Sequence, residues 1–387
     1  MNPLNVLHVD SAGEYRGGQN KARLLMKELR ALGGVRQGLV TRSDSRLVRE
    51  AGSLGVEIHS VSWLSPIDPR PVMRILAALK RDFDLVHAHD SHGLQSALVA
   101  RWLGGRRTPI VASRRVSVRM RSPSTWRQAD TVVAVSDAVS SVLRDQGIPG
   151  EKIRVIPDGV SPEEIENRLP GRLRKKAGAS PGQILVGTVG ALSPEKGHDW
   201  FLRSAALIAS DHPEARFVIF DDGPERDRLV RLAHSLGLAD RVSLPGAVEE
   251  IGRSIRDLDL FVMPSLEEGL GTAAVEAMLA GCPVMVSGAG GLVDLAGDLI
   301  PTIPPGDVAA LAAEMDRILS DTAARSLLTR RSRERGGEFT SVKTARSTLQ
   351  LYRELVECYT AHEHGTPTSG LATDKEAVQH SDPRTFS

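Results

Sequence analysis

The sequence predicts an α/β protein made of two Rossmann-like domains whose parallel sheets face each other across a cleft. Two observations carry this prediction. A length of 387 residues suggests two domains at about 150 residues each. Short apolar, β-rich runs also alternate with amphipathic segments of helix length along the chain. Continuous apolar strands separated by helices are typical of βαβ units and of a parallel sheet covered on both faces.

The first half of the chain supplies the elements of one such domain. Its predicted strands are 5–10, 35–40, 56–61, 84–89, 109–113, 131–136 and 153–157. Helical periodicity lies between them, over 20–32, 72–81, 94–103 and 138–146. We therefore expect a first Rossmann-like domain over residues 1–165.

A stretch rich in proline, glycine and charge then interrupts the alternation, and 166–182 is predicted to be a linker. The pattern restarts with predicted strands at 184–190, 216–222, 241–246, 259–265, 283–288 and 299–303, which gives a second Rossmann-like domain over 183–340. A helix at about 341–360 is expected to pack back on the first domain. The polar residues 361–387 are predicted to be a disordered tail. Ligands of such sheets bind at the carboxyl ends of the strands, here in the cleft.

Composition excludes several classes of protein. The chain has 49 basic and 48 acidic residues, whereas a dedicated nucleic-acid binder carries a basic surplus, so no nucleic-acid partner is expected. Its two cysteines, Cys282 and Cys358, have no paired spacing, which argues against a disulfide framework or a cysteine zinc site and favours a cytoplasmic location. The start lacks the features of a secretion signal, and the apolar runs fall short of the about 20 residues of a membrane span.

The segment 264–291 carries the richest chemistry. Glu268 and Glu276 bracket a glycine-containing turn and the expected start of a helix near Thr272. Gly269 and Gly271 let the backbone approach a ligand closely, and the free N–H groups of the helix start suit a phosphate. Glu276 lies about one turn into that helix, where it can accept hydrogen bonds from vicinal hydroxyls. The alternative is a strand, loop and helix whose glycines only make the turn and whose acids are solvated.

Three further glycine turns follow predicted strands. In 187–202, Gly190 and Lys196 precede a helix, and Lys196 is either a point charge for a phosphate or a surface lysine. Gly223 lies in a strand-end turn whose acids by themselves indicate helix capping. Gly17 and Gly18 join the first strand to the first helix without a G-x-G-x-x-G fingerprint, so they support dinucleotide binding only weakly.

Three histidines, His87, His89 and His92, stand at a strand end that faces the expected cleft. Their spacing can chelate a metal ion. The alternative, which we favour, is a set of polar loop groups near an acceptor.

Taken in order, these segments resemble glycosyltransferase family 4, retaining enzymes with the two-domain GT-B fold. The order is a Gly-Gly loop, HAHD, VVAVSDAV, VIPDGV, VGALSPEKG, DDGPERDRL, LPG and PSLEEGLGTAAVEAMLAGCPV, over about residues 4–360. The two glutamates with seven residues between them, in this setting, are the most specific part. The resemblance implies a first domain that binds the acceptor and a second that binds a nucleotide-diphosphate sugar.

The resemblance also implies residue roles. Glu268 contacts the donor sugar and Glu276 the nucleotide ribose, while Lys196 binds the diphosphate, so Glu268 and Lys196 are the expected catalytic residues. The turn 244–248, which ends at Val248, lies where the base rests. The remaining donor-binding residues are Gly17, Gly18, Gly190, Gly223, Gly269, Leu270, Gly271 and Thr272. No cofactor and no metal is expected, and the donor is UDP- or GDP-linked.

Three positions depart from the family pattern. Ala191 stands where the family often has arginine, Asp158 replaces the usual asparagine, and Ser113, Arg114 and Arg115 replace the usual histidine segment after the fifth strand. We interpret these departures as subfamily variation. The predicted function is transfer of a sugar to a hydroxyl of a glycan or lipid-linked glycan in cell-envelope polysaccharide or lipopolysaccharide synthesis. The alternatives are a catalytically silent nucleotide-sugar-binding partner, and a sugar-nucleotide epimerase or a phosphorylase of the same fold.

The stretch from Arg101 to Gln128 indicates the acceptor. It holds eight arginines and no acid, although arginine is also the common basic residue throughout the chain. Guanidinium groups bind phosphate or carboxylate bidentately. We therefore expect an anionic acceptor bound by His89, Arg114 and Arg115. We also expect peripheral contact with the inner face of the cytoplasmic membrane, with Met120 and Trp126 available for shallow insertion.

Overall fold

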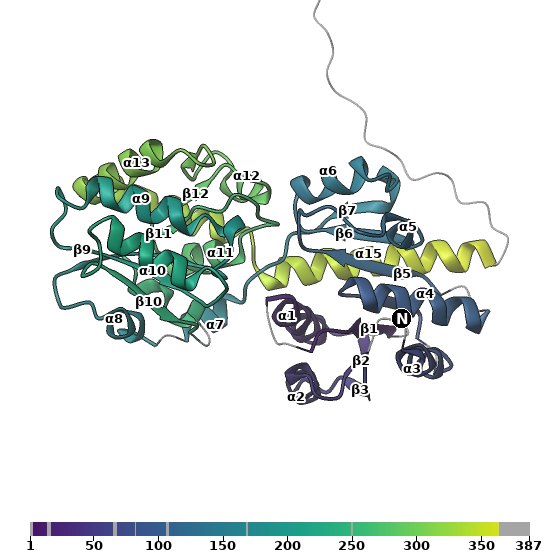
Figure 1. Cartoon of the computed structure of the whole chain (residues 1–387). Coiled ribbons are helices and arrows are strands. Elements are labelled where there is room, and N and C mark those ends of the chain that lie inside the picture. Colours follow the sequence, from purple (N-terminus) through teal and green to yellow (C-terminus); the bar gives the residue numbers. More distant parts are fainter. Residues whose placement is uncertain are drawn as a thin grey trace, which may run out of the picture.

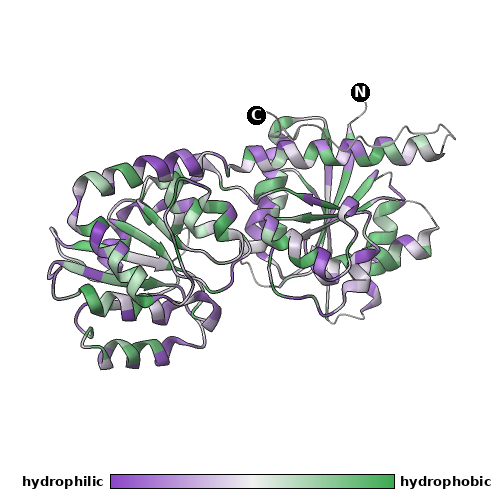
Figure 2. Ribbon diagram, turned by 90° about the horizontal axis from the view of Figure 1, so that it is seen from above, coloured by the Kyte–Doolittle hydropathy of each residue, from purple (hydrophilic) through white to green (hydrophobic). Residues whose placement is uncertain are grey.

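The computed structural model describes residues 3–13, 17–64, 68–81, 83–105, 108–167, 169–248 and 251–363. Two α/β domains lie side by side, each built on one parallel sheet with helices packed around it (Figure 1). Hydrophobic residues gather on the strands inside both domains, and the helices show hydrophilic residues outward (Figure 2). The two-sheet fold class predicted from the alternating pattern is confirmed.

The first sheet has seven parallel strands in the order β3-β2-β1-β4-β5-β6-β7. The strands are β1 (Leu4–Asp10), β2 (Val35–Arg42), β3 (Glu57–Val61), β4 (Leu85–Ala88), β5 (Ile110–Arg114), β6 (Thr131–Ala134) and β7 (Ile153–Val155). The helices are α1 (Gly17–Leu32), α2 (Arg46–Ser53), α3 (Pro69–Leu79), α4 (Ser91–Gly104), α5 (Pro123–Arg127), α6 (Asp137–Asp145) and α7 (Pro162–Glu166). Because β1 lies between β2 and β4, the ends of the first and fourth strands meet in the middle of the sheet.

The second sheet has six parallel strands in the order β10-β9-β8-β11-β12-β13. The strands are β8 (Ile184–Val189), β9 (Ala215–Phe220), β10 (Val242–Gly246), β11 (Leu260–Met263), β12 (Val284–Ser287) and β13 (Thr302–Ile303). The α-helices are α8 (Arg172–Ala177), α9 (His198–Ile208), α10 (Arg226–Ser235), α11 (Thr272–Ala280), α12 (Gly291–Ala296), α13 (Val308–Ser320), α14 (Thr322–Gly336) and α15 (Ser341–Glu363). Short 3₁₀ turns include η2 (Pro194–Lys196), η3 (Ile251–Arg253) and η4 (Ile255–Asp257).

Helix α15 leaves the second domain and packs along the first (Figure 1). Its Leu349 and Tyr352 belong to the cluster of buried side chains that also holds Val6 of β1 and Leu29 of α1. The two chain crossings between the domains lie against each other: Val160 N–H donates to Phe339 O, and Ser341 N–H donates to Val160 O at 2.9 Å. A Cβ on Gly159 would lie 2.2 Å from the carbonyl carbon of Thr340, so only glycine fits where the crossings meet.

The segment 166–182, predicted as a linker, contains helix α8. Leu173 is fully buried there, and the Asp257 carboxylate accepts from the N–H groups of Gly171 and Leu173 at 2.8 and 2.9 Å. Leu173 is the one large apolar residue of this helix, and the others are charged or small. A single apolar position gives no helical periodicity, which is why the sequence pattern predicts a linker. The predicted tail lies outside the described residues from 364 onward.

Candidate active site

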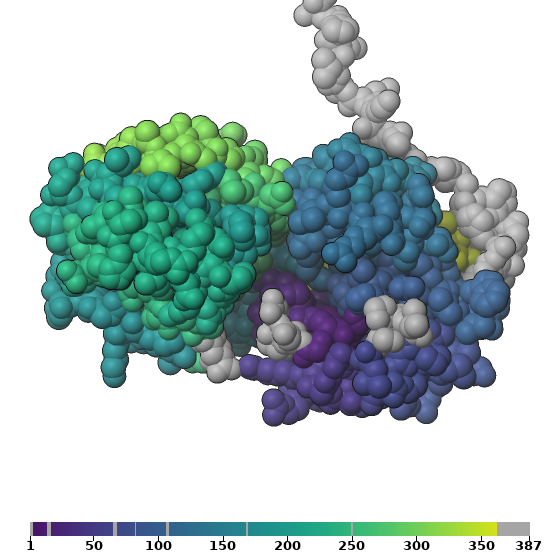
Figure 3. Space-filling model, in the orientation of Figure 1, coloured from purple at the N-terminus to yellow at the C-terminus, as the bar shows by residue number. Residues whose placement is uncertain are grey.

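Two cavities lie along the boundary between the domains, which is hollowed on the face seen in Figure 3. The first has a volume of about 390 Å³ and is bounded by the strand ends of the first domain and the loop before α11. Nine predicted site residues line it: Gly17, Gly18, His89, Arg114, Arg115, Glu268, Leu270, Gly271 and Thr272. The second, of about 500 Å³, is lined by Val248 and Glu276 as well as residues of α1, α7 and η3. The two share Gly17, so they adjoin at the start of α1.

Lys196 and Glu268, the two predicted catalytic residues, form an ion pair with Nζ and Oε2 2.7 Å apart. Both are mostly shielded, with side chains 24% and 16% exposed. Their loops are tied together by the Leu266 N–H, which donates to Glu195 O at 2.7 Å. The lysine stem passes beside Gly190, where a Cβ would lie 3.7 Å from Lys196 Cδ, an ordinary van der Waals distance that does not require glycine.

Gly269 brings the second domain into direct contact with the first. A Cβ on Gly269 would lie 2.0 Å from the carbonyl oxygen of Arg115, so any side chain would push the domains apart. Gly271, the residue before α11, has a φ of 89°, a left-handed conformation that favours glycine. These glycines thus place the first free N–H groups of α11 at the cavity wall, where the helix dipole favours an anion.

Glu276 lies in the second turn of α11 and lines the adjoining cavity. Burial raises the pKa of its carboxyl, while the Lys21 ammonium acts in the opposite direction. Lys21 is a site residue that the sequence analysis missed. It is 5% exposed, lines the first cavity, and its Nζ donates to Gly159 O at 3.0 Å. A helix that begins at Gly17 places Lys21 one turn later on the same side, a spacing that could have identified it.

Gly223 lines neither cavity. A Cβ on Gly223 would lie 2.6 Å from Leu192 O, so this glycine lets the β9–α10 turn pack on the loop that carries Ala191. The same loop is also held by His198, whose Nε2 lies 3.1 Å from both Gly190 O and Ala191 O.

Arg114 and Arg115 lie in the first cavity but differ in their partners. Arg115 Nε donates to Asp158 Oδ2 at 2.9 Å, with both side chains about 15% exposed, so the aspartate that replaces the family asparagine neutralises this arginine. Arg114 lies over the Trp126 ring, 5.6 Å from its centroid, and burial lowers the pKa of its guanidinium.

The expectation that Met120 and Trp126 are free for membrane insertion is wrong. Their exposed fractions are 8% and 3%, because Trp126 packs under Arg114 and both belong to the core of the first domain. The large exposed apolar side chains of this domain include Trp102, Leu103 and Val99 on α4, at 80%, 51% and 41%.

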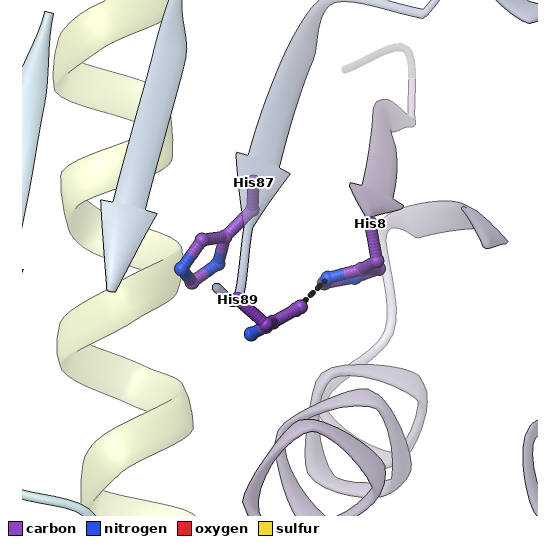
Figure 4. A group of neighbouring side chains, drawn as sticks. All are labelled: His8, His87 and His89. Carbon is purple, nitrogen blue, oxygen red and sulfur yellow. Dashed lines mark hydrogen bonds between the residues drawn. The ribbon is translucent and has the colours of Figure 1, made fainter. Parts of the chain in front are cut away.

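Three buried histidines from two neighbouring strand ends stand together: His8, His87 and His89 (Figure 4). Their ligand nitrogens lie within 4.8 Å of one another, whereas His92 is exposed at the start of α4. The sequence therefore identified two of the three members, and β1 supplies the third. Burial lowers the pKa of all three imidazoles, that of His8 to about 4, so they are neutral at physiological pH.

Asp10, the last residue of β1, is a further cavity residue that the sequence analysis did not single out. Burial and the nearby Asp90 raise its pKa to about 6. Its carboxylate accepts from Ala12 N–H at 3.0 Å and from Gln19 Nε2 at 3.2 Å. A carboxyl group that titrates near neutral pH at the cavity wall can exchange a proton with a bound hydroxyl.

Comparison with known proteins agrees with this geometry. Two family models match, glycosyltransferase family 4 over residues 15–164 and glycosyl transferases group 1 over 171–335. A 2-deoxystreptamine glucosyltransferase of Streptomyces kanamyceticus is 35% identical over 206 residues, 51% of this chain and 53% of that protein. A D-inositol 3-phosphate glycosyltransferase of Salinispora arenicola is 27% identical over 82% of this chain and 71% of that protein. The chain thus spans only about half the length of the first of these relatives.

Solved structures share the fold. Anabaena HepE, crystallised with UDP and glucose, superposes with a TM-score of 0.76 at 21% identity and covers 91% of this chain and 100% of its own. The two matched models cover the two Rossmann-like domains in turn, and the glutamate loop lies at the cleft between them. The chain therefore belongs to glycosyltransferase family 4, with the GT-B fold.

Proposed function

We propose that the protein is a retaining glycosyltransferase that moves a hexose-type sugar from a UDP- or GDP-linked donor to an acceptor hydroxyl. The observation that carries this proposal is the meeting of Lys196, Glu268 and the start of α11 at the domain boundary. A cation and a helix start together suit a diphosphate, and the adjacent carboxylate suits sugar hydroxyls.

The donor would extend across both cavities. Glu276 would accept hydrogen bonds from the ribose, with Val248 beside the base in the larger cavity. The diphosphate would lie between the Gly269–Thr272 backbone, Lys196 and Lys21, so that Lys21 offsets the arginine lost at Ala191. Charge on the departing diphosphate would be stabilised by groups already in place, the electrostatic part of the catalysis.

The first cavity would hold the acceptor. Its wall combines Arg114 and Arg115 with His89, which supports an anionic glycan or lipid-linked glycan. A relative named for inositol 3-phosphate supports the same class. Asp10 and Asp90 line the same wall, which favours a second candidate, an amino-bearing polyol acceptor. Transfer to matched phosphate-bearing and amine-bearing acceptors separates the two classes.

A role in cell-envelope polysaccharide or lipopolysaccharide synthesis at the inner face of the cytoplasmic membrane remains part of the proposal. Among the described residues, no helix has the length and apolarity to cross a bilayer. Membrane contact would be peripheral, through Trp102 and Leu103 of α4 rather than through the buried Trp126.

The test is calorimetric titration of Glu276→Ala with UDP and GDP, next to Glu334→Ala, an exposed glutamate of α14, as control. We expect a loss of affinity of about tenfold or more for the nucleotide that the wild type binds. Unchanged affinity would remove the ribose role.

Turnover of a donor panel then separates the alternatives. Nucleotide released together with a glycosylated product supports transfer. Binding without turnover would indicate the silent partner, and an altered sugar still attached to its nucleotide would indicate the epimerase.

A further inference from the structure

A directional hydrogen-bond chain runs from the first domain's core to Arg115. Gln37 Nε2 donates to Met26 O at 3.0 Å, which leaves Gln37 Oε1 to face His8 Nε2 at 3.2 Å. His8 Nδ1 lies 3.0 Å from His89 Nε2, the contact that is drawn as a dashed line in Figure 4. Arg115 Nη2 lies 3.4 Å from His89 Nδ1, and Arg115 Nη1 donates to His89 O at 3.0 Å.

The two ends of this chain impose one polarity on everything between them. A carbonyl only accepts, so the amide of Gln37 donates to Met26, and its oxygen must accept from His8 Nε2–H. A neutral His8 then accepts at Nδ1 from His89 Nε2–H. Starting from the other end, a guanidinium only donates, so His89 must accept at Nδ1 and carry its proton on Nε2. Both ends of the chain thus require the same tautomers of His8 and His89.

An added proton on His8 would break the chain at its longest contact, the one between His89 Nδ1 and Arg115 Nη2. If His8 were an imidazolium, both its nitrogens would donate, His89 Nε2 would have to accept, and His89 Nδ1–H would oppose the Arg115 donor. Burial, which keeps both imidazoles neutral, therefore preserves the polarity of the chain.

The chain acts on a group that faces the cleft. Arg115 has five N–H donors, of which one goes to Asp158, one to His89 O and one to His89 Nδ1. A planar guanidinium held at three points has one orientation, and its two remaining N–H groups are those left for a ligand of the first cavity, which Arg115 lines. His8 and Gln37 line neither cavity, so they act only through this chain.

We propose that His8 and Gln37 are positioning residues that, through His89, fix the orientation of Arg115 toward the anionic group of the acceptor. This inference rests on the proposed function, in which Arg115 binds the acceptor. It assigns His8 and His89 of the histidine cluster to orientation rather than to metal binding.

The test compares two substitutions of one buried residue. His8→Gln keeps an acceptor for His89 and a donor for Gln37, whereas His8→Leu keeps only the bulk. We expect His8→Leu to raise the acceptor KM about tenfold with the donor KM within about twofold, and His8→Gln to restore most of the loss. Equal KM values for the two variants, or equal damage to the donor KM, would overturn the proposal.

A second measurement needs neither variant nor activity. Long-range ¹H–¹⁵N spectra of the full-length wild type, with histidine ¹⁵N-labelled, report the tautomer of each ring. We expect His8 and His89 both to be protonated on Nε2 alone. A proton on Nδ1 of either ring would overturn the proposed hydrogen-bond chain. One equivalent of a transition metal in the purified protein, lost on chelation together with these tautomers, would assign the cluster to a metal instead. If no donor is turned over, the proposed function fails, but the spectra still show whether the hydrogen-bond chain has the expected tautomers.

Discussion

The ammonium of Lys196 lies 2.7 Å from the carboxylate of Glu268, 72 residues further along the chain. The residue proposed to hold the diphosphate is therefore neutralised by the residue proposed to hold the sugar. Donor binding must exchange this ion pair for a lysine–phosphate contact.

Glu268→Gln should separate these two roles. Removing the charge frees Lys196, so affinity for the bare nucleoside diphosphate should rise by up to about tenfold. Sugar transfer should fall by about a hundredfold or more, because the hydrogen bonds to the sugar weaken. Calorimetry and turnover measure the two effects, with the exposed Glu267→Gln as control. Weaker diphosphate binding in Glu268→Gln would show that the carboxylate itself supports the phosphate site.

Gly269→Ala should block the contact between the domains. The added methyl would lie 2.0 Å from Arg115 O, so the two domains cannot meet as they do here. Relieving this clash needs a shift of about 1 Å, and a shift of that size at a reaction centre costs about a hundredfold in rate. We expect this loss in turnover, with thermal stability little changed. The matched control is Gly52→Ala in α2, where the nearest atom is Ile58 Cγ1 at 3.9 Å. Wild-type turnover in Gly269→Ala would mean that this contact is absent from the reacting state.

Asp10→Asn should stabilise the protein at pH 7.5. The pKa of Asp10 is raised to about 6 from 3.8, so the folded state holds a proton that the unfolded state releases between these values. Stability therefore falls as pH rises through 6, and above it the ionised Asp10 costs about 3 kcal/mol, which the asparagine avoids. Urea unfolding of both proteins should show this gain at pH 7.5, shrinking as pH falls toward 4.

The wild type and the Asp10→Asn variant must be compared because His8 changes the stability of both with pH in the direction opposite to Asp10. The pKa of His8 is lowered to about 4, so its contribution is full above 6.5 and is lost as pH falls toward 4. The wild-type curve alone would not separate the two groups. A gain from Asp10→Asn that stays constant from pH 4 to 8 would contradict the raised pKa of Asp10.

Replacing Trp102 and Leu103 with glutamine should weaken binding to anionic lipid vesicles, because the large apolar area of these side chains is exposed on α4. Co-sedimentation should show a loss of about tenfold or more, while turnover of a water-soluble acceptor analogue is retained. Leu327→Gln, an exposed leucine of α14 in the second domain, is the control. Equal vesicle binding by all three proteins would exclude this face as the membrane contact.

Local patterns in the sequence determined the strands, the order of the two domains and the glutamate loop. Most strands contain a short apolar run, and several of the turns that follow them carry glycines, so these features are readable without knowing what packs where. The loop from Glu268 to Glu276 was likewise readable, since its turn, its helix start and its acids are neighbours in the chain.

Only the tertiary structure decided which distant residues share the site. His8 joins His89 because β1 and β4 are neighbours in a parallel sheet, a pairing set by the crossover between them and not by either strand's residues. Arg115 follows β5 and Asp158 follows β7, and these two residues meet although β6 lies between their strands. The burial of Trp126 and the helix at 172–177 depend on what packs against a single side chain, and one side chain leaves no periodic signal in the sequence.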